Sequence, residues 1–207
     1  MRLIIFGSTG SVGRLLVEQA LQDNHLVTAF LRDPGKLAIT NTNLKIIRGD
    51  VLDYQSVEKS MKNQEAVLCT LGAGSKGTVR AEGTRNIVRA MESNGVKRLI
   101  CQSTLGAGNS KGNLNFFWKH IMFGMLLKQA YMDHELQENH VIQSKLDWTI
   151  VRPAAFTDGS RTGKYRHGFG PYEKGLMLKI SRADVADFIL NQVVQNTYFR
   201  KTPGQSY

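Results

Sequence analysis

Residues 1–16, MRLIIFGSTGSVGRLL, combine a short apolar run, three evenly spaced glycines and the beginning of a helical repeat. The run at 3–6 has the length of a buried strand, and Gly7, Gly10 and Gly13 separate it from the repeat. A strand, a tight turn and a helix start in this order predict a dinucleotide-phosphate site. Backbone N–H groups of such a turn approach a pyrophosphate closely, and the positive end of the helix dipole faces its charge.

The three glycines have separate uses in such a site. Gly7 permits the turn, Gly10 permits close approach of the phosphates, and Gly13 lets the helix pack on the sheet. The pattern G-x-x-G-x-x-G has one more residue between its first two glycines than the commonest fingerprint. The alternative is a strand-to-helix turn that binds nothing. We expect the cofactor to contact the turn residues Gly7, Thr9, Gly10, Ser11, Val12 and Gly13.

The rest of the chain alternates apolar runs with helical patterns. A long helix is predicted over Val79–Asn94 with Gly95 as its stop, and Asp53 and Ser181 have the position of helix N-caps. A polar tail is expected after the last helix. The alternation predicts an α/β fold, a single Rossmann-like domain over 1–207 with helices on both faces of a doubly wound parallel sheet. The further strands are expected at 25–31, 44–47, 66–71, 99–101 and 147–151.

The composition is that of an ordinary globular protein. No apolar run approaches the roughly 18 residues that a membrane span requires. The beginning of the chain lacks the long apolar region of a secretion signal, so we expect a cytoplasmic protein without a membrane partner. Cys69 and Cys101 lie in apolar runs and show no metal-ligand spacing. We therefore expect two core thiols and no metal site.

The formal net charge is +10, from 27 Lys and Arg against 17 Asp and Glu. Such a balance suits nucleic acid, an anionic surface or a small anionic ligand such as NADPH or a flavin phosphate. The basic residues are scattered along the chain, so a merely solubilising surface is an equal alternative. Nucleic acid is not expected as a partner, because only the net charge favours it.

Two strand ends carry information about the cofactor. The run at 25–31 is followed by Arg32, at the place where an acid favours the 2′-hydroxyl of NAD and an arginine accommodates the 2′-phosphate of NADP. We therefore expect NADPH, with NADH as the alternative cofactor; a solvated Arg32 without a ligand is the structural alternative. At the end of 66–71, Leu71, Gly72 and Ala73 are expected beside the second phosphate and the nicotinamide ribose.

The order of motifs along the chain resembles a known family. GSTGSVG, LRDP, GDV, TLGAG, EGTRNIV, QST, WTIVRPAAFTDG and ISRADVADF follow one another as in the biliverdin-IXβ reductase and NADPH-dependent flavin reductase family, within the NmrA-like atypical short-chain dehydrogenases/reductases. The resemblance implies NADPH in an open crevice and hydride transfer to flat conjugated acceptors such as FMN, riboflavin, quinones or open-chain tetrapyrroles. Ala155, where the bilin-reducing member has a histidine, and a shorter loop after Gly72 speak against bilin reduction in particular.

The resemblance also assigns residues. It puts Asp50 and Val51 against the adenine and adds Ser103 and Pro153 to the cofactor contacts. A serine or threonine at the end of the fifth strand hydrogen-bonds the substrate carbonyl in these enzymes, so Ser103 and Thr104 are candidate catalytic residues, with Thr104 preferred. A strand-end hydroxyl that only satisfies the backbone is the alternative.

The usual Tyr-Lys pair of short-chain dehydrogenases is missing. Tyr131 is followed four residues later by Glu135, and an acid there raises the pKa of a phenol instead of lowering it. Tyr131 is therefore not expected to act as general acid. His134 lies where the lysine would be sought and is the third catalytic candidate, with a purely structural histidine as the alternative.

The densely apolar segment 116–127, FFWKHIMFGMLL, cannot bury every side chain on one helical face. Some of its residues are expected to wall a flat substrate pocket; a dimer contact is the second reading and a membrane-surface patch the third. The basic loop 161–167 offers cations for acidic groups of a substrate, or is simply solvated. The candidate substrate contacts are Phe116, Trp118, Phe156 and Arg166.

We thus expect an NADPH-dependent reductase of flat conjugated acceptors, with FMN as substrate instead of a tightly bound group. The chain is expected as a monomer or weak homodimer. The alternative is a non-catalytic sensor that reads the NADP redox state, as some NmrA-like proteins do, because the missing Tyr-Lys pair suits that role equally well.

Overall fold

The computed structural model describes residues 1–72 and 77–207. Its eight-stranded sheet has the order β3-β2-β1-β4-β5-β6-β10-β8, and every neighbouring pair is parallel except β10 and β8. The first six strands have the doubly wound order, which confirms the predicted α/β fold. The bounds are β1 Arg2–Phe6, β2 Leu26–Leu31, β3 Leu44–Arg48, β4 Ala66–Cys69, β5 Arg98–Gln102, β6 Asp147–Pro153, β8 Arg166–His167 and β10 Gly204–Ser206.

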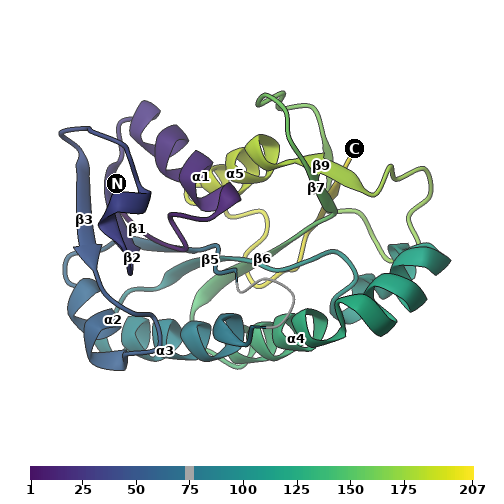
Figure 1. Cartoon of the computed structure of the whole chain (residues 1–207), viewed down its shortest axis with the longest axis horizontal. Helices are drawn as coiled ribbons and strands as arrows, with labels where there is room; N and C mark the ends of the chain where they lie inside the picture. The colour runs from purple at the N-terminus through teal and green to yellow at the C-terminus, as the bar shows by residue number, and fades with distance from the viewer. Residues whose placement is uncertain (73–76) are drawn as a thin grey trace.

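Helices cover both faces of this sheet, as Figure 1 shows. One face carries α1 (Ser11–Gln22) and α5 (Arg182–Asn191). The opposite face carries α2 (Tyr54–Ser60), α3 (Val79–Asn94) and α4 (Lys128–Ile142). Among the described residues, no helix is both long enough and apolar enough to cross a membrane.

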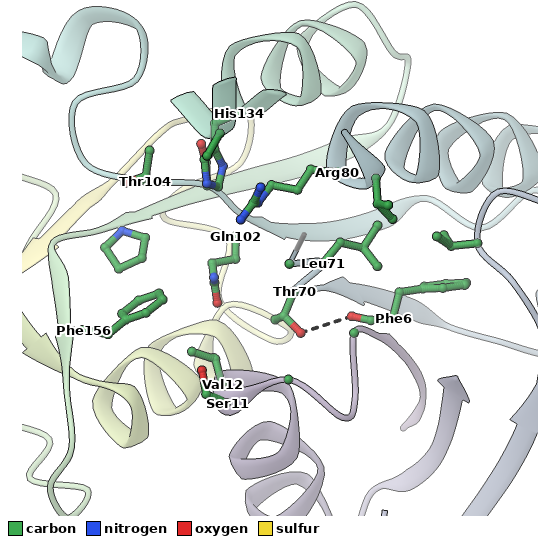
Figure 2. A pocket seen from close by; sticks show the side chains of 18 of the residues that line it. Phe6, Ser11, Val12, Thr70, Leu71, Arg80, Gln102, Thr104, His134 and Phe156 are labelled. Carbon is green, nitrogen blue, oxygen red and sulfur yellow. Dashed lines mark hydrogen bonds between the residues drawn. The ribbon is translucent and has the colours of Figure 1, made fainter. Parts of the chain in front are cut away.

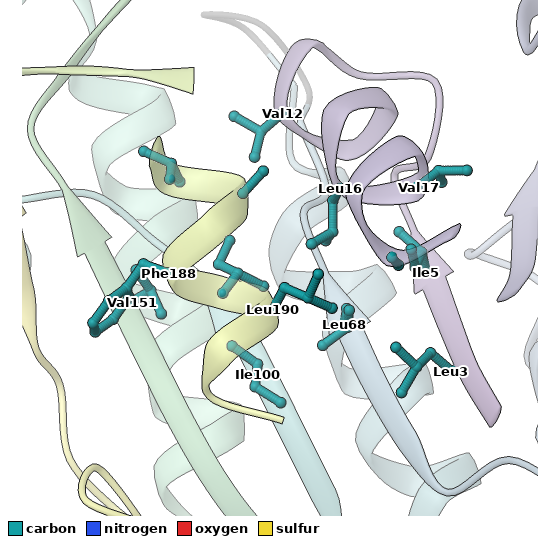
Figure 3. Close-up of a cluster of buried hydrophobic side chains, with 14 of the residues drawn as sticks. Leu3, Ile5, Val12, Leu16, Val17, Leu68, Ile100, Val151, Phe188 and Leu190 are labelled. Carbon is teal, nitrogen blue, oxygen red and sulfur yellow. The ribbon is translucent and has the colours of Figure 1, made fainter. Parts of the chain in front are cut away.

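The core follows from the two-residue period of the strands. In β1, Leu3 and Ile5 belong to the cluster under α1 and α5, whereas Ile4 and Phe6 belong to the cluster on the other face. All four side chains are completely buried. Figure 3 shows the first cluster, in which Leu16 of α1 and Leu190 of α5 lie against the strands. A strand that is apolar on both sides is the signature of a parallel sheet between two helical layers.

The predicted helix ends are confirmed. The helix α3 begins at Val79 and stops at Gly95, which has a φ of 72°. The carboxylate of Asp53 accepts the N–H of Gln55 at the start of α2, and the hydroxyl of Ser181 accepts the N–H of Asp184 at the start of α5.

The expected polar tail is wrong. Residues 204–206 form β10, a buried strand that pairs with the end of β6. The side chain of Gln205 donates to the carbonyl of Asp184, so a polar residue is paired inside the protein. A second sheet, of β7 (Ala155–Thr157) and β9 (Lys179–Ser181), was also not expected. Short 3-10 helices, η1 (Pro34–Lys36) and η2 (Gly108–Asn113), and a π-helix, η3 (Phe117–Leu126), complete the elements.

The register of the central strands aligns their carboxyl ends. Phe6 lies opposite Phe30 of β2 and Cys69 of β4, and Cys69 lies opposite Cys101 of β5. The residues that follow these strands therefore meet along one edge of the sheet. Parallel α/β sheets bind their ligands at this edge, where the strand order reverses.

Candidate active site

A cleft of about 530 Å³ runs along the carboxyl edge of the sheet. It lies where β1 and β4 end side by side. From this pair, β2 and β3 follow on one side of the sheet and β5 and β6 on the other, so the strand order reverses here. Predicted site residues that line it come from every central element: Gly7, Thr9, Gly10, Ser11, Val12, Arg32, Asp50, Val51, Leu71, Gly72, Ser103, Thr104, Trp118, His134, Pro153 and Phe156. The predicted contact Ala73 lies outside the described residues.

The glycine turn after β1 has no room for a side chain at Gly7 or Gly13. Gly7 has a φ of 84°, and a Cβ there would lie 2.4 Å from the carbonyl oxygen of Thr70. A Cβ at Gly13 would lie 2.1 Å from the carbonyl oxygen of Gly7. Gly13 does not line the cleft; it lets α1 pack against the turn. Thr70 ties the end of β4 to the end of β1, because its N–H and its hydroxyl both donate to the carbonyl of Phe6 (Figure 2).

The N-terminus of α1 is free of internal anions. Its N-cap is Gly10, which has no side chain to accept the first N–H groups, and no acidic residue lies in the first turn. Ser11 and Val12 begin the helix at the wall of the cleft. Unsatisfied N–H groups and the positive end of a helix dipole form an anion site. The turn therefore fits the pyrophosphate of a dinucleotide.

The loop after β2 presents one cation, Arg32, to the same cleft. Arg32 is exposed at the rim. The next residue, Asp33, has its carboxylate engaged by the N–H of Gly35 at 3.1 Å, and Lys36 Nζ lies 4.0 Å away. The guanidinium of Arg14 on α1 donates to the carbonyl of Lys36 at 2.6 Å. The surroundings of Arg32 are thus basic, and Asp33 is occupied as an N-cap.

The part of the cleft wall that contains Val51 and Leu71 is held by α3. The side-chain amide of Asn86 donates to the carbonyls of Val51 and Leu52 at 3.0 and 3.1 Å, which fixes the loop after β3. A Cβ at Gly83 would lie 2.8 Å from both Leu71 Cδ1 and Val51 Cγ1. Because Gly83 lacks that atom, α3 packs close enough to hold Val51 and Leu71 against the cleft.

Three polar atoms in the cleft lack a partner among the described residues. They are the Ser103 hydroxyl, Gln102 Oε1 and His134 Nδ1. Ser103 is only 2% exposed, and a buried hydroxyl without a hydrogen bond is costly. By contrast, the hydroxyl of Thr104 has a long contact of 3.4 Å to the carbonyl of Leu105. Of the two predicted hydroxyls, Ser103 is the one left for a ligand.

Arg80 and His134 approach this polar region from two helices (Figure 2). Burial, and then the positive charge of Arg80, lower the pKa of His134 to about 3. The imidazole is therefore neutral at physiological pH. A neutral imidazole accepts or donates a hydrogen bond, but it holds no proton that it readily gives up.

Arg80 is a cleft residue that the sequence reasoning missed. Its guanidinium makes one contact within the described part of the chain, to Asp133 Oδ2 at 3.4 Å. Asp133 is also occupied by the N–H groups of Arg80 and Ala81, at 3.2 and 3.0 Å, and so caps α3 from the neighbouring helix. Its negative charge is shared with the start of α3, which leaves the guanidinium incompletely neutralised at the cleft. The sequence around this arginine is an ordinary helical pattern and does not indicate that its side chain lines a cleft.

Tyr131 is held as predicted. Its hydroxyl donates to Glu135 Oε1 at 2.9 Å and lies 3.2 Å from the carbonyl of Gly106. Burial first, and then the Glu135 carboxylate, raise the pKa of Tyr131 to about 12. The phenol lines the cleft but is a weaker acid than an ordinary tyrosine.

The apolar wall of the cleft comes from one side of the π-helix η3. Its i→i+5 pattern is visible where the N–H of Leu127 donates to the carbonyl of Met122 at 2.7 Å. Residues five apart then face the same side, and Trp118 and Phe123 both line the cleft with ring centroids 5.8 Å apart. Phe123 in turn lies 5.2 Å from the ring of Tyr131.

Two expected substrate contacts lie elsewhere. Phe116 is 72% exposed and does not line the cleft, because it precedes the first turn of η3 on the outer side. Arg166 on β8 pairs with Glu173 and donates to the carbonyl of Lys174, outside the cleft. In the same basic loop, Arg161 is paired with Asp187. These two arginines are therefore structural ion-pair partners in the protein.

The comparisons with known proteins agree with this geometry. Residues 7–196 match a family model described as NAD(P)H-binding. The UPF0659 protein YMR090W of Saccharomyces cerevisiae is 28% identical, over 98% of this chain and 91% of its own length.

Two solved structures share the fold at lower identity. ChuY, described as an anaerobillin reductase from Escherichia coli O157:H7, is 23% identical with a TM-score of 0.83, covering 100% of this chain and 97% of that one. A short-chain dehydrogenase/reductase from Veillonella parvula DSM 2008, in complex with NADP, is 18% identical with a TM-score of 0.82, covering 100% of this chain and 94% of that one.

Proposed function

Since the chain belongs to the NAD(P)H-binding family, we propose that it is an NADPH-dependent reductase of flat conjugated acceptors such as FMN or riboflavin. One observation carries the proposal. A single cleft is lined by an uncapped helix N-terminus at Gly10, by the aromatic rings of Trp118 and Phe123, and by Ser103, whose hydroxyl has no partner among the described residues. A nucleotide and a planar acceptor require this combination of an anion site and an aromatic wall.

The cofactor preference rests on the loop after β2. Arg32, with Arg14 and Lys36 near it, supplies positive charge where a 2′-phosphate would lie. Asp33 would be the carboxylate for the 2′-hydroxyl of NAD, but it caps η1. NADPH is therefore favoured over NADH. The solved relative in complex with NADP has the same fold, which supports this cofactor class.

The chemistry required of the protein is mainly positioning. NADPH, when bound, supplies a hydride; with a proton from solvent, the acceptor becomes its two-electron-reduced form and NADP⁺ is left. Trp118 and Phe123 hold the planar acceptor and exclude water from one of its sides, while Ser103 donates a hydrogen bond to a carbonyl oxygen that gains negative charge. Holding the reacting groups in contact contributes roughly 7 to 11 kcal/mol toward the barrier.

No tuned side-chain acid is needed for such acceptors. A flavin or quinone spreads the incoming charge over its ring system and takes its proton from water. This suits a cleft in which Tyr131 is bonded to Glu135 and His134 is neutral. The description of the ChuY relative as an anaerobillin reductase supports a flat acceptor. Ala155, which lines the cleft here, supports flavins and quinones over bilins.

The experiment is a turnover assay with purified protein. Oxidation of NADPH is followed with FMN, riboflavin, a soluble quinone and biliverdin, and binding of NADPH and NADP⁺ is measured by calorimetry. We expect NADPH binding and acceptor-dependent oxidation, fastest with a flavin or quinone. Tight NADPH binding without oxidation by any of the four acceptors would refute the reductase.

A non-catalytic NADP(H) sensor is the second candidate. One observation favours it: Tyr131 is a weaker acid than an ordinary tyrosine, and His134 is neutral at physiological pH. A sensor must bind NADPH and NADP⁺ with different affinities, because a ligand with equal affinity for two states shifts neither. A large affinity ratio without turnover would select this function, whereas turnover selects the reductase.

A further inference from the structure

The outer side of η3 is an exposed apolar surface. The side chains of Phe116 and Met125 are 72% and 74% exposed, and Leu126 is 65% exposed. Phe117 and Ile121 add 49% and 38% exposure to the same segment. These five residues, Phe116, Phe117, Ile121, Met125 and Leu126, are called the outer face of η3. In Figure 1 the segment forms the end of the molecule beyond α4, on the side away from β3.

The π-helical register explains why this face exists. Residues five apart share a side, so Phe116, Ile121 and Leu126 recur on one side while Trp118 and Phe123 recur on the other. The inner side is used by the cleft. A contiguous exposed apolar patch marks an interaction site more often than scattered apolar residues do.

The lysines within η3 and directly after it have no acidic residue beside them in the sequence. Between Glu92 and Asp133 the sequence contains no Asp or Glu. Two lysines belong to the segment itself: Lys119 lies within η3 and Lys128 directly after it. Lys128 is exposed and Lys119 is half-buried. Together with the net charge of +10 of the whole chain, these lysines favour an anionic partner for this face.

The combination of apolar and cationic side chains distinguishes between the possible classes of partner. A second copy of this chain would bring Lys119 and Lys128 toward their own counterparts, and like charges repel. Nucleic acid is bound through its phosphates and base edges, so Met125 and Leu126 would have no apolar group of such a partner to contact. An anionic bilayer surface takes both kinds of group: apolar side chains enter the boundary of headgroups and acyl chains, and lysines reach the lipid phosphates.

We propose that the outer face of η3 seats the protein on anionic lipid surfaces. The protein lies on the bilayer through this short helix, with Phe116, Met125 and Leu126 buried in the interface and Lys119 and Lys128 at the headgroups. The inner side of the same helix stays in the cleft. This inference does not depend on the proposed reductase function, because it concerns residues that do not line the cleft.

The test is cosedimentation with vesicles. The full chain is mixed with vesicles of phosphatidylglycerol and phosphatidylcholine, or of phosphatidylcholine alone, at increasing salt. We expect binding to the anionic vesicles that falls as salt rises. The double variant F116S/M125S is expected to reduce the partition coefficient at least about tenfold. The matched control Val194→Ser, at a 67% exposed apolar residue outside the segment, should leave it unchanged.

A charge pair separates the lipid from other occupants. K119E/K128E and K59E/K62E change the net charge equally, but only the first lies at η3. We expect the first to weaken binding to anionic vesicles and the second to retain it. NADPH binding and the melting temperature of F116S/M125S should match the unaltered chain, which excludes misfolding.

Three results would contradict the lipid-surface proposal. Equal losses for both lysine pairs would show that only net charge matters, and the proposal would fail. A dimer that F116S/M125S converts to monomer in sedimentation, without vesicle binding by the parent chain, would make the face a self-association surface. Absence of vesicle binding in a monomeric parent chain would also overturn the proposal.

Discussion

Tyr131 donates a hydrogen bond to Glu135 Oε1 at 2.9 Å, one turn later along α4. The carboxylate keeps the phenol protonated and raises its pKa to about 12, with burial as the larger cause. A general acid contributes about 10² to 10⁴ to a rate, so its removal is easy to detect. We expect Tyr131→Phe to keep kcat for flavin reduction within about threefold, well short of that loss. A hundredfold loss would restore the phenol as the proton donor.

Ser103→Ala should lower turnover more than Tyr131→Phe does. Ser103 lines the cleft and its hydroxyl has no partner in the described protein, so we expect its hydrogen bond to go to the developing charge on the acceptor. Removing one such donor costs about 10² to 10³ in kcat where it is fully used. We expect at least a loss of about tenfold, in kcat rather than KM. Thr104→Ala is the control, and a larger loss there would assign the role to Thr104.

Arg32→Ala should discriminate between the two nicotinamide cofactors. A charge-assisted hydrogen bond contributes about 1.5 to 3 kcal/mol, so the KM for NADPH should rise about tenfold to a hundredfold. The KM for NADH, which lacks the 2′-phosphate, should stay nearly constant. Arg48→Ala removes an exposed arginine at the end of β3 that does not line the cleft, and it should affect neither cofactor. Equal losses for NADPH and NADH in Arg32→Ala would contradict the assignment.

His134 should show no titration near neutral pH. Its pKa is lowered to about 3 by burial and by Arg80, so the neutral form persists through the range in which an ordinary histidine titrates. NMR of the imidazole from pH 5 to 8 should show a constant shift for His134. In Arg80→Gln one of the two causes is removed, and the pKa should rise. An unchanged titration in that variant would mean that burial alone holds the imidazole neutral.

The carboxylate of Asp184 should support stability down to acidic pH. Burial alone would raise its pKa, but hydrogen bonds from Tyr207 at 2.6 Å, from Thr162 and from the N–H of Gly163 outweigh it and lower the pKa below its ordinary 3.8. A lowered folded-state pKa means that the contribution is complete above the unfolded value and is lost as pH falls through the folded one.

The matching experiment is chemical unfolding of Asp184→Asn. We expect a loss of about 1.5 to 3 kcal/mol in the free energy of unfolding at pH 7, shrinking toward pH 3. Asp23→Asn, at an exposed carboxylate at the end of α1, should change it by less than about 0.5 kcal/mol. A deficit of Asp184→Asn that is constant down to pH 3 would mean that packing, and not the charge, is responsible.

The βα units of the fold could be predicted from the sequence, because each is marked by an apolar run, a turn and a helix start. A strand, Gly7 and a helix start define one βα unit, and the apolar runs and caps around Asp53 and Gly95 define the following units. Their carboxyl ends meet because parallel strands share an edge, so the position of the cleft beside the glycine turn was predictable. The finer family assignment, to flavin or biliverdin reductases, rests on motif order and remains a proposal.

The rest depends on contacts that the local sequence does not encode. The strand β10 consists of Gly204, Gln205 and Ser206, which show no apolar alternation and are strand residues only because β6 offers an open edge. Arg80 lines the cleft, and its partner Asp133, which also caps α3, comes from another helix. The π-register that puts Trp118 and Phe123 on one side replaces the α-helical period assumed for that segment.

The i→i+5 register of η3 makes the segment tolerant of one kind of change and intolerant of another. Replacing one side chain of η3 alters either the cleft wall or the outer face, because different residues form the two. Losing or gaining a single residue between Lys119 and Met122 would instead rotate every later position, so that Phe123 would leave the wall and a solvent-facing neighbour would replace it. Evolution can therefore retune this wall by point substitution, whereas a one-codon insertion or deletion there would scramble it.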